Sequence, residues 1–211
     1  MAQSIEQEER KPVLRLASAS PRRRQLLELI GVPHLVTPAD IDETPRATEP
    51  PDQYVARLAR EKAAAIWARH PDLPVLAADT TVVVDREILG KPESETDAHY
   101  MLGRLSGREH LVHTGVALWS REHQLLGLTT TQVRFAPLSR TVIHAYWQSG
   151  EPRGKAGAYA IQGLGAVFVT GISGSYTGVM GLPLFETARL LRQAGIAVWG
   201  GTLPGLLEGA E

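Results

Sequence analysis

Residues 74–84, PVLAADTTVVV, form an apolar run rich in valine. A run of this length and composition is typical of a strand that is buried inside a sheet. Asp79 is the one charged residue in it, and we expect this aspartate to interrupt the strand. With 211 residues, of which 43% are hydrophobic, the chain is long enough to supply the packed core that such a strand needs.

Helix-like and strand-like patterns alternate along the rest of the chain. An apolar run near the N-terminus leads into Pro21, which favours a first helical turn, and the apolar stripe that follows stops at Gly31. No repeat, low-complexity tract or long linker divides the sequence. We therefore expect one mixed α/β domain over residues 13–211, preceded by a mobile tail over residues 1–12. The expected helices lie at 21–30, 51–70, 96–107, 139–150 and 184–195, and the expected strands at 13–17, 74–84, 115–118, 129–135 and 166–172.

The charge and the composition exclude several classes of protein. Lys and Arg number 22 against 23 Asp and Glu, a formal net charge of −1, so no overall field draws the chain to nucleic acid or to a membrane. The absence of cysteine removes disulfides, thiolate nucleophiles and cysteine-based zinc sites. The opening residues, MAQSIEQEERKP, are polar and acidic, unlike a signal peptide, and no apolar run reaches the roughly 18 residues that span a bilayer. We expect a cytoplasmic protein that binds neither nucleic acid nor membrane.

The stretch LASASPRRRQLLELIG, residues 16–31, predicts a local site for an anion. Three arginines, at positions 22–24, fall in the first turn of the expected helix, where the backbone dipole already disfavours cations. An anion bound at the helix N-terminus would offset their mutual repulsion. We expect Arg22 and Arg23 to face this anion, whereas Arg24 is either solvated or supports the fold.

Three further charged residues are candidates for a site, and each has a simpler alternative. If Asp79 is buried it needs a cation, a metal or a hydrogen-bond donor, because an unpaired buried carboxylate is costly; the alternative is that it caps a turn. Lys62 lies on the apolar side of its expected helix, where a long stem that snorkels past core residues is the favoured explanation. Lys91 follows a turn in ILGKPES, and a lone lysine is usually a solvated surface charge.

The glycine-rich segment RGKAGAYAIQGLGA, residues 153–166, allows the backbone to approach a ligand closely. Within it the amide of Gln162 has the groups needed to read the edge of a base, and the alternative is a bulged hairpin in which this residue has no special role. The segment lacks the third glycine of a dinucleotide fingerprint, and no phosphate-loop motif occurs, so those nucleotide folds are excluded. His110 and His113 suggest metal ligands, but residues three apart in a strand point to opposite faces, and we expect structural roles for both.

Several motifs follow one another in a fixed order, namely LASASPRR, LAREKA, AADT, LGKP, LSGR, KAGAYAIQGLGA and VMGLPL. In this order they resemble the Maf family of nucleoside triphosphate pyrophosphatases, and the resemblance runs from Val13 to Gly195. It implies an α/β fold in which a mixed, twisted sheet is flanked by helices, with two lobes around a central cleft, similar to the inosine triphosphatase fold. It also implies hydrolysis of a nucleoside triphosphate to the monophosphate and pyrophosphate.

The resemblance also implies roles for individual residues. Asp79 is the implied catalytic residue, as proton acceptor for the attacking water, as metal ligand or as both, with Glu43 as a second carboxylate for Mg²⁺ or Mn²⁺. The residues that the resemblance implies for phosphate binding are Ser18, Arg23, Lys62 and Lys91, and those for substrate specificity are Arg22, Thr80 and Gln162. The segment AYAIQG looks like the family branch that acts on dTTP and UTP, whereas a branch that acts on 7-methyl-GTP has glutamate in place of the glutamine.

Two positions depart from the family's pattern. Gly154 stands where the family often carries aspartate, and Ala78 stands where glycine is frequent. The implied role is house-cleaning of dTTP, UTP or modified uridine triphosphates, with a link to cell-division arrest. The alternative is a nucleotide-responsive regulator of septum formation with little or no hydrolysis. A nucleoside triphosphate is the expected partner, and formation of a homodimer is left open.

Overall fold

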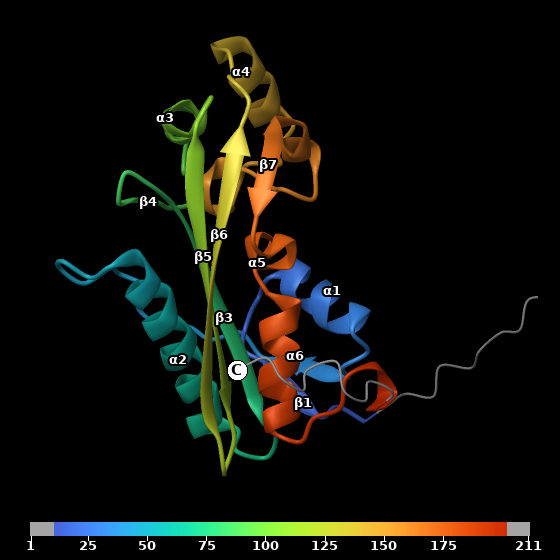
Figure 1. Cartoon of the computed structure of the whole chain (residues 1–211). Helices are drawn as coiled ribbons and strands as arrows, with labels where there is room; N and C mark the ends of the chain where they lie inside the picture. The colour runs from blue at the N-terminus through green and yellow to red at the C-terminus, as the bar shows by residue number, and fades with distance from the viewer. Residues whose placement is uncertain (1–10, 202–211) are drawn as a thin grey trace, which may run out of the picture.

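A mixed sheet of seven strands forms the centre of the computed structural model, which describes residues 11–201 (Figure 1). The strands follow one another in the order β2-β1-β3-β5-β6-β7, and β4 pairs with β3 beside this path. β1 is parallel to β2 and to β3, and the remaining pairs are antiparallel. The expected tail lies outside the described residues except for positions 11 and 12, as does the end of the expected domain beyond residue 201.

Helices and strands alternate along the chain, as the sequence predicts. The strands are β1 (Leu14–Leu16), β2 (His34–Val36), β3 (Val75–Val84), β4 (Glu87–Leu89), β5 (Glu109–Trp119), β6 (Gln124–Phe135) and β7 (Val169–Ser173). The α-helices are α1 (Pro21–Leu29), α2 (Pro51–Arg69), α3 (Glu95–Leu105), α4 (Arg140–Gln148), α5 (Tyr176–Met180) and α6 (Leu184–Gln193). The 3₁₀ helices are η1 (Ala156–Ala158), η2 (Leu164–Phe168) and η3 (Trp199–Gly201).

β3 is the buried strand that the valine-rich run predicts, since nine of its ten residues are buried. Asp79 does not interrupt it, so that expectation was wrong. This residue pairs in regular register with Gly115 of β5. Backbone groups build the ladder between two strands, and a carboxylate is therefore tolerated in the middle of a strand where its charge has a partner. That partner is Lys62 of α2.

The strands expected at 115–118 and 129–135 are longer in the structure, where they form parts of β5 and β6. In β5 the omitted residues include His110, His113 and Thr114, which are buried and polar and so break the apolar run that reveals a buried strand. The turn between the two strands lies at residues 120–123.

The C-terminal part of the sheet differs from expectation at one strand and one helix. The strand expected at 166–172 begins at Val169, because the residues before it form η2. The sequence does not predict α5, which has five residues and is too short to show a helical period.

Helices cover both faces of the sheet, as Figure 1 shows with α2 on one side and α1 and α6 on the other. Alternate residues of β3 make the two faces distinct. Leu76 and Ala78 belong to the core beneath α1 and α6, whereas Val75 and Ala77 belong to the core beneath α2.

A third core lies at the other end of the long strands, under α3 and α4. It contains Leu102 from α3, Trp147 from α4 and the aromatic rings of Phe135 and Phe168. Because β3, β5 and β6 contribute to the cores at both ends, two lobes share one sheet. Within residues 11–201, none of the helices has the length and apolar character that crossing a membrane requires.

Candidate active site

A cleft of about 960 Å³ receives residues from both lobes. The first turn of α1 and the loop before it, the middle of β3, and the segment 151–163 line its walls. All nine residues that the family resemblance singles out line this cleft, namely Ser18, Arg22, Arg23, Glu43, Lys62, Asp79, Thr80, Lys91 and Gln162. The structure therefore brings together every expected site residue, and their individual roles stay predictions.

Lys62 joins two carboxylates inside this cleft. Its Nζ atom lies 2.6 Å from Oδ1 of Asp79 and 2.6 Å from Oε1 of Glu43, and its side chain is only 8% exposed. A snorkelling stem would carry the ammonium group out to solvent, so that explanation of Lys62 was wrong. Asp79 is likewise paired with a buried cation and does not cap a turn.

The loop that carries Glu43 is held against α2. The hydroxyl of Tyr54 donates a hydrogen bond to the backbone carbonyl of Glu43 at 2.9 Å. The guanidinium of Arg57 binds both carboxylate oxygens of Glu49 and the carbonyl of Thr44. Two side chains of one helix thus fix the loop at Glu43 and just after it, so an irregular segment presents the carboxylate in a defined place.

Neighbouring cations stabilise the ionised form of Glu43. Burial opposes its ionisation, but the hydrogen bond and charge of Lys62, together with Lys91 and Arg23, outweigh this and hold the pKa of Glu43 below its usual value. Glu43 is therefore a carboxylate at neutral pH. It accepts hydrogen bonds and can bind a cation.

Arg23 is fixed at the N-terminal end of α1. Its Nε donates to the carbonyl of Gly181 at 2.7 Å, and its two Nη atoms donate to Oγ of Ser18 at 3.2 Å and to Oγ1 of Thr80 at 3.3 Å. Burial lowers the pKa of Arg23, and the nearby charge of Asp79 opposes that shift. The guanidinium is thus a preorientated positive group in the wall of the cleft.

The hydroxyl of Thr80 belongs to a chain of hydrogen bonds with a fixed direction. Thr114 donates its proton to the carbonyl of Gly178 at 2.8 Å. The 3.0 Å contact between the two threonine hydroxyls must therefore use the proton of Thr80, because a hydroxyl has only one to donate. Thr80 accepts from Arg23 and donates to Thr114, so its position in the structure is that of a support for the arginine.

Arg22 and Lys91 line the cleft without a hydrogen bond or ion pair to any residue in the range 11–201. Burial lowers the pKa of Arg22, and the neighbouring Glu151 opposes the shift. Both cations are available to a ligand. Arg24 does not line the cleft and forms an exposed ion pair with Glu28, so it is solvated, which is one of the two roles expected for it.

The segment that carries Gln162 is held by Glu151, which the sequence did not single out. The Glu151 carboxylate accepts hydrogen bonds from the backbone N–H groups of residues 164–165, both at 2.9 Å, and from the Tyr146 hydroxyl at 2.7 Å. The Tyr146 oxygen accepts in turn from the backbone N–H of Ala160 at 3.1 Å. The backbone is therefore fixed on both sides of Gln162, so the position from which the Gln162 side chain extends into the cleft is fixed as well.

Close approach to Glu151 and Tyr146 explains two glycines of this segment. A Cβ atom at Gly163 would overlap the Glu151 carboxylate, and one at Gly165 would come to 2.7 Å from the Tyr146 hydroxyl. The segment contains η1 and η2 and is not a hairpin, so that alternative was wrong. The only sequence hint to Glu151 is its place between the glycine that ends α4 and the glycine-rich segment.

Both departures from the family's pattern can be placed. Gly154 lines the cleft, so this substitution falls within the site itself. Ala78 lies in regular strand pairing with Val116, and a position of this kind requires no unusual backbone angles.

The cleft carries a surplus of positive charge. Six basic and three acidic side chains line it, the basic ones being Arg22, Arg23, Lys62, Lys91, Arg153 and Lys155 and the acidic ones Glu43, Asp79 and Glu151. Such a surplus suits a ligand with several negative charges. The neighbouring carboxylates Glu43 and Asp79 add groups that can accept a proton or hold a divalent cation.

Several known proteins are similar to this chain. A family model described as "Maf-like protein" matches residues 13–194. The dTTP/UTP pyrophosphatase of Methylobacillus flagellatus is 58% identical over 187 residues, which cover 88% of this chain and 94% of that protein. The dTTP/UTP pyrophosphatase of Bordetella parapertussis is 54% identical, with 89% and 95% covered. Among solved structures, the Ham1 protein of Staphylococcus aureus matches with a TM-score of 0.43 and 14% identity, over 58% of this chain and 71% of that one.

Proposed function

The chain belongs to the Maf family, and we propose that it hydrolyses dTTP and UTP to the nucleoside monophosphate and pyrophosphate. The observation that carries this proposal is the buried Lys62, placed between Asp79 and Glu43 in a cleft that is otherwise lined with cations. The names of the relatives, which are 52% to 58% identical to this chain, support the choice of substrates.

Binding of the triphosphate follows from the charges. Arg22 and Lys91 are free to meet phosphate oxygens, and Arg23 presents a guanidinium that is already orientated. Ser18 accepts hydrogen bonds from Arg23 and from the N–H of Ser20, so its own proton is left for a phosphate oxygen. These groups neutralise the charge that develops on the nonbridging and leaving oxygens when water attacks the α-phosphorus and pyrophosphate departs.

We assign to Asp79 the role of general base, which takes a proton from the attacking water. Lys62 donates to its Oδ1 atom, which fixes the carboxylate and leaves Oδ2 as the oxygen that takes the proton from the attacking water.

The two carboxylates fit a divalent cation. Lys62 lies 2.6 Å from one oxygen of Glu43 and one oxygen of Asp79, and each carboxylate has a second oxygen that can serve as a ligand. Mg²⁺ is commonly held by one or two carboxylates together with substrate phosphates. Glu43 and Asp79 would hold Mg²⁺ or Mn²⁺, which when bound supplies positive charge against the phosphate oxygens and lowers the pKa of water.

The base is recognised by Gln162. Its amide presents an NH₂ donor to O4 of thymine or uracil and a carbonyl acceptor to N3–H, whereas cytosine presents an amino group and an unprotonated nitrogen there. Because an amide can rotate, discrimination against cytosine need not be strict. Arg22 contributes to specificity by contact with the nucleotide, and Thr80 contributes by fixing Arg23.

The alternative, a nucleotide-responsive regulator of septum formation, is not favoured. A binding protein needs affinity alone, and a buried carboxylate paired with lysine adds nothing to its affinity for an anion. House-cleaning of modified uridine triphosphates, a cytoplasmic location and a homodimer all stay predictions.

A panel of nucleoside triphosphates tests the proposal. We expect release of pyrophosphate, and not of orthophosphate, from dTTP and UTP in the presence of Mg²⁺ or Mn²⁺, with much slower release from purine nucleotides. Tight binding of dTTP with no hydrolysis under any of these conditions would instead establish the regulator.

A further inference from the structure

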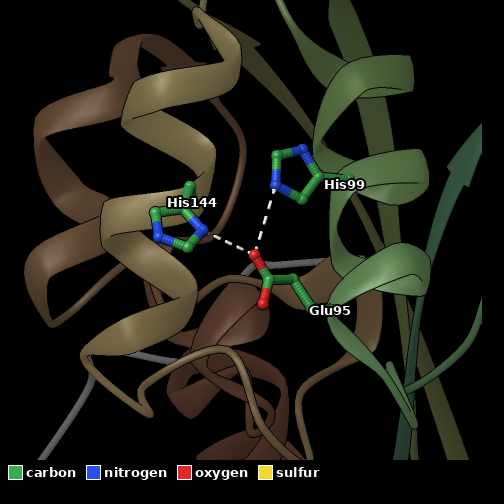
Figure 2. Close-up of side chains that lie close together, drawn as sticks. All are labelled: Glu95, His99 and His144. Atoms are coloured by element: carbon green, nitrogen blue, oxygen red, sulfur yellow. Dashed lines mark hydrogen bonds and ion pairs between the residues drawn. The ribbon is translucent and has the colours of Figure 1, made fainter.

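A second group of metal-ligating side chains lies apart from the cleft. Glu95 and His99 come from α3 and His144 comes from α4, and Figure 2 shows the carboxylate between the two imidazole rings. One ligand atom from each residue lies within 4.8 Å of the others. None of the three lines the cleft described above.

Well-packed helices position these three residues. Glu95 and His99 are four apart on α3 and share one face of the helix. A capping box between Ser94 and Asp97 fixes the first turn of this helix, where the glutamate lies. His144 follows Ile143, which is buried in the core that α3 and α4 share. The three ligand atoms are therefore held by rigid elements, as a preformed metal site requires.

The distances suit a tetrahedral ion. Nδ1 of His144 lies 2.6 Å and Nε2 of His99 lies 3.7 Å from the same carboxylate oxygen, Oε1 of Glu95. Tetrahedral zinc with bonds of about 2.0 to 2.1 Å separates its ligand atoms by about 3.3 Å, which falls between these two values. The third separation, between the two ring nitrogens, is at most 4.8 Å, so rotations of the three side chains can bring these atoms around one ion.

A hydrogen bond explains only part of this arrangement. The 2.6 Å contact between His144 and Glu95 is such a bond, but His99 at 3.7 Å is beyond that range and still turns toward the same oxygen. The side chains are 39%, 30% and 57% exposed for Glu95, His99 and His144, so an ion can reach them and water can complete its shell.

We propose that Glu95, His99 and His144 bind one Zn²⁺ ion, with water as the fourth ligand, and that this ion joins α3 to α4. Two imidazoles with one carboxylate form a ligand set that suits Zn²⁺ and not Mg²⁺, which prefers oxygen ligands. The site is thus chemically distinct from the pair of carboxylates in the cleft. Because α4 leads directly to Glu151, the ion stabilises the lobe that holds the base-reading segment.

Calorimetric titration of ZnCl₂ into tag-free, metal-stripped protein tests the proposal, with millimolar Mg²⁺ present to compete for the cleft. We expect one Zn²⁺ per chain for the wild type and also for Asp79→Asn, which removes a carboxylate from the cleft. His99→Ala and His144→Ala should lose this binding, and Glu95→Gln should weaken it at least about tenfold. The matched control is His123→Ala, in the turn between β5 and β6, which should bind zinc like the wild type.

Thermal unfolding gives a second measurement on the same proteins. Without zinc, the wild type and His144→Ala should unfold at similar temperatures, which shows that the variant is folded. Zinc at about a hundredfold excess over its dissociation constant should raise the unfolding temperature of the wild type by about 5 °C or more relative to the variant. The proposal is overturned if the wild type binds no zinc, if both histidine variants bind it unchanged, or if Asp79→Asn alone abolishes binding.

Discussion

Replacing Glu151 with Gln tests whether recognition of the base depends on the carboxylate that holds the Gln162 segment. The substitution keeps the size of the side chain but turns one acceptor oxygen into an NH₂ donor. With the nitrogen at Oε2, the backbone N–H of Leu164 faces a donor. With the nitrogen at Oε1, the N–H of Gly165 and the hydroxyl of Tyr146 both lose their acceptor.

The first of these two orientations of the amide loses fewer hydrogen bonds, so it determines the size of the expected loss in kcat/KM. It leaves the N–H of Leu164 without its charged acceptor. A hydrogen bond to a charged group contributes about 1.5 to 3 kcal/mol, and the lower end applies because Leu164 is 58% exposed and water can replace the lost acceptor. About 1.5 kcal/mol corresponds to about a tenfold loss in kcat/KM for dTTP. We expect most of it in KM, because Asp79 is held by Lys62 and not by this segment. The preference for dTTP over GTP should fall as well, since a displaced Gln162 no longer reads the base.

Steady-state kinetics with dTTP, UTP and GTP measure both effects, and thermal unfolding shows whether the variant is folded. Glu28→Gln is the matched control, because Glu28 forms only an exposed ion pair with Arg24, and its kinetics should not change. The reasoning is refuted if folded Glu151→Gln retains the wild-type kcat/KM and base preference. It is also refuted if kcat falls equally for every nucleotide with KM unchanged, since the residue would then act in the chemical step.

Asp79→Asn should keep the fold and nucleotide binding but lower kcat at least about a hundredfold, because a positioned general base is lost; unchanged turnover in the folded variant would move that role to Glu43. Gln162→Glu removes the donor that faces O4, so the ratio of kcat/KM for dTTP to that for 7-methyl-GTP should fall roughly tenfold to a hundredfold, and a constant ratio would contradict base reading by this residue. EDTA should abolish hydrolysis and excess Mg²⁺ or Mn²⁺ should restore it, whereas full turnover in metal-free buffer would exclude a metal requirement. Burial lowers the pKa of His110 from 6.5 to about 4, so the unfolded chain binds a proton in this interval that the folded chain does not. The free energy of unfolding is therefore unaffected by His110 above pH 6.5 and decreases as the pH falls toward 4, by about 2 kcal/mol between pH 6.5 and 5. Urea unfolding should show this decrease in the wild type and a smaller one in His110→Gln.

The class of fold and nine residues that line the cleft could be predicted from the sequence. Proline at the start and glycine after the end predict α1 correctly, and the valine-rich run predicts β3, because these signals depend on a few neighbouring residues. The order of the motifs then led to nine residues that the structure places around one cleft. Local patterns can predict these elements because backbone preference and apolar periodicity act over short separations along the chain.

Only the tertiary structure decided how these residues are paired. Lys62 looks like a snorkelling surface lysine in its own helix, and its burial between two carboxylates follows from the packing of α2 against β3. Glu151 gives little local signal, because its partners Leu164 and Gly165 come 13 and 14 residues later in the chain. Charge pairing and hydrogen bonding across such separations depend on how whole elements pack together, and no short window of sequence contains that information.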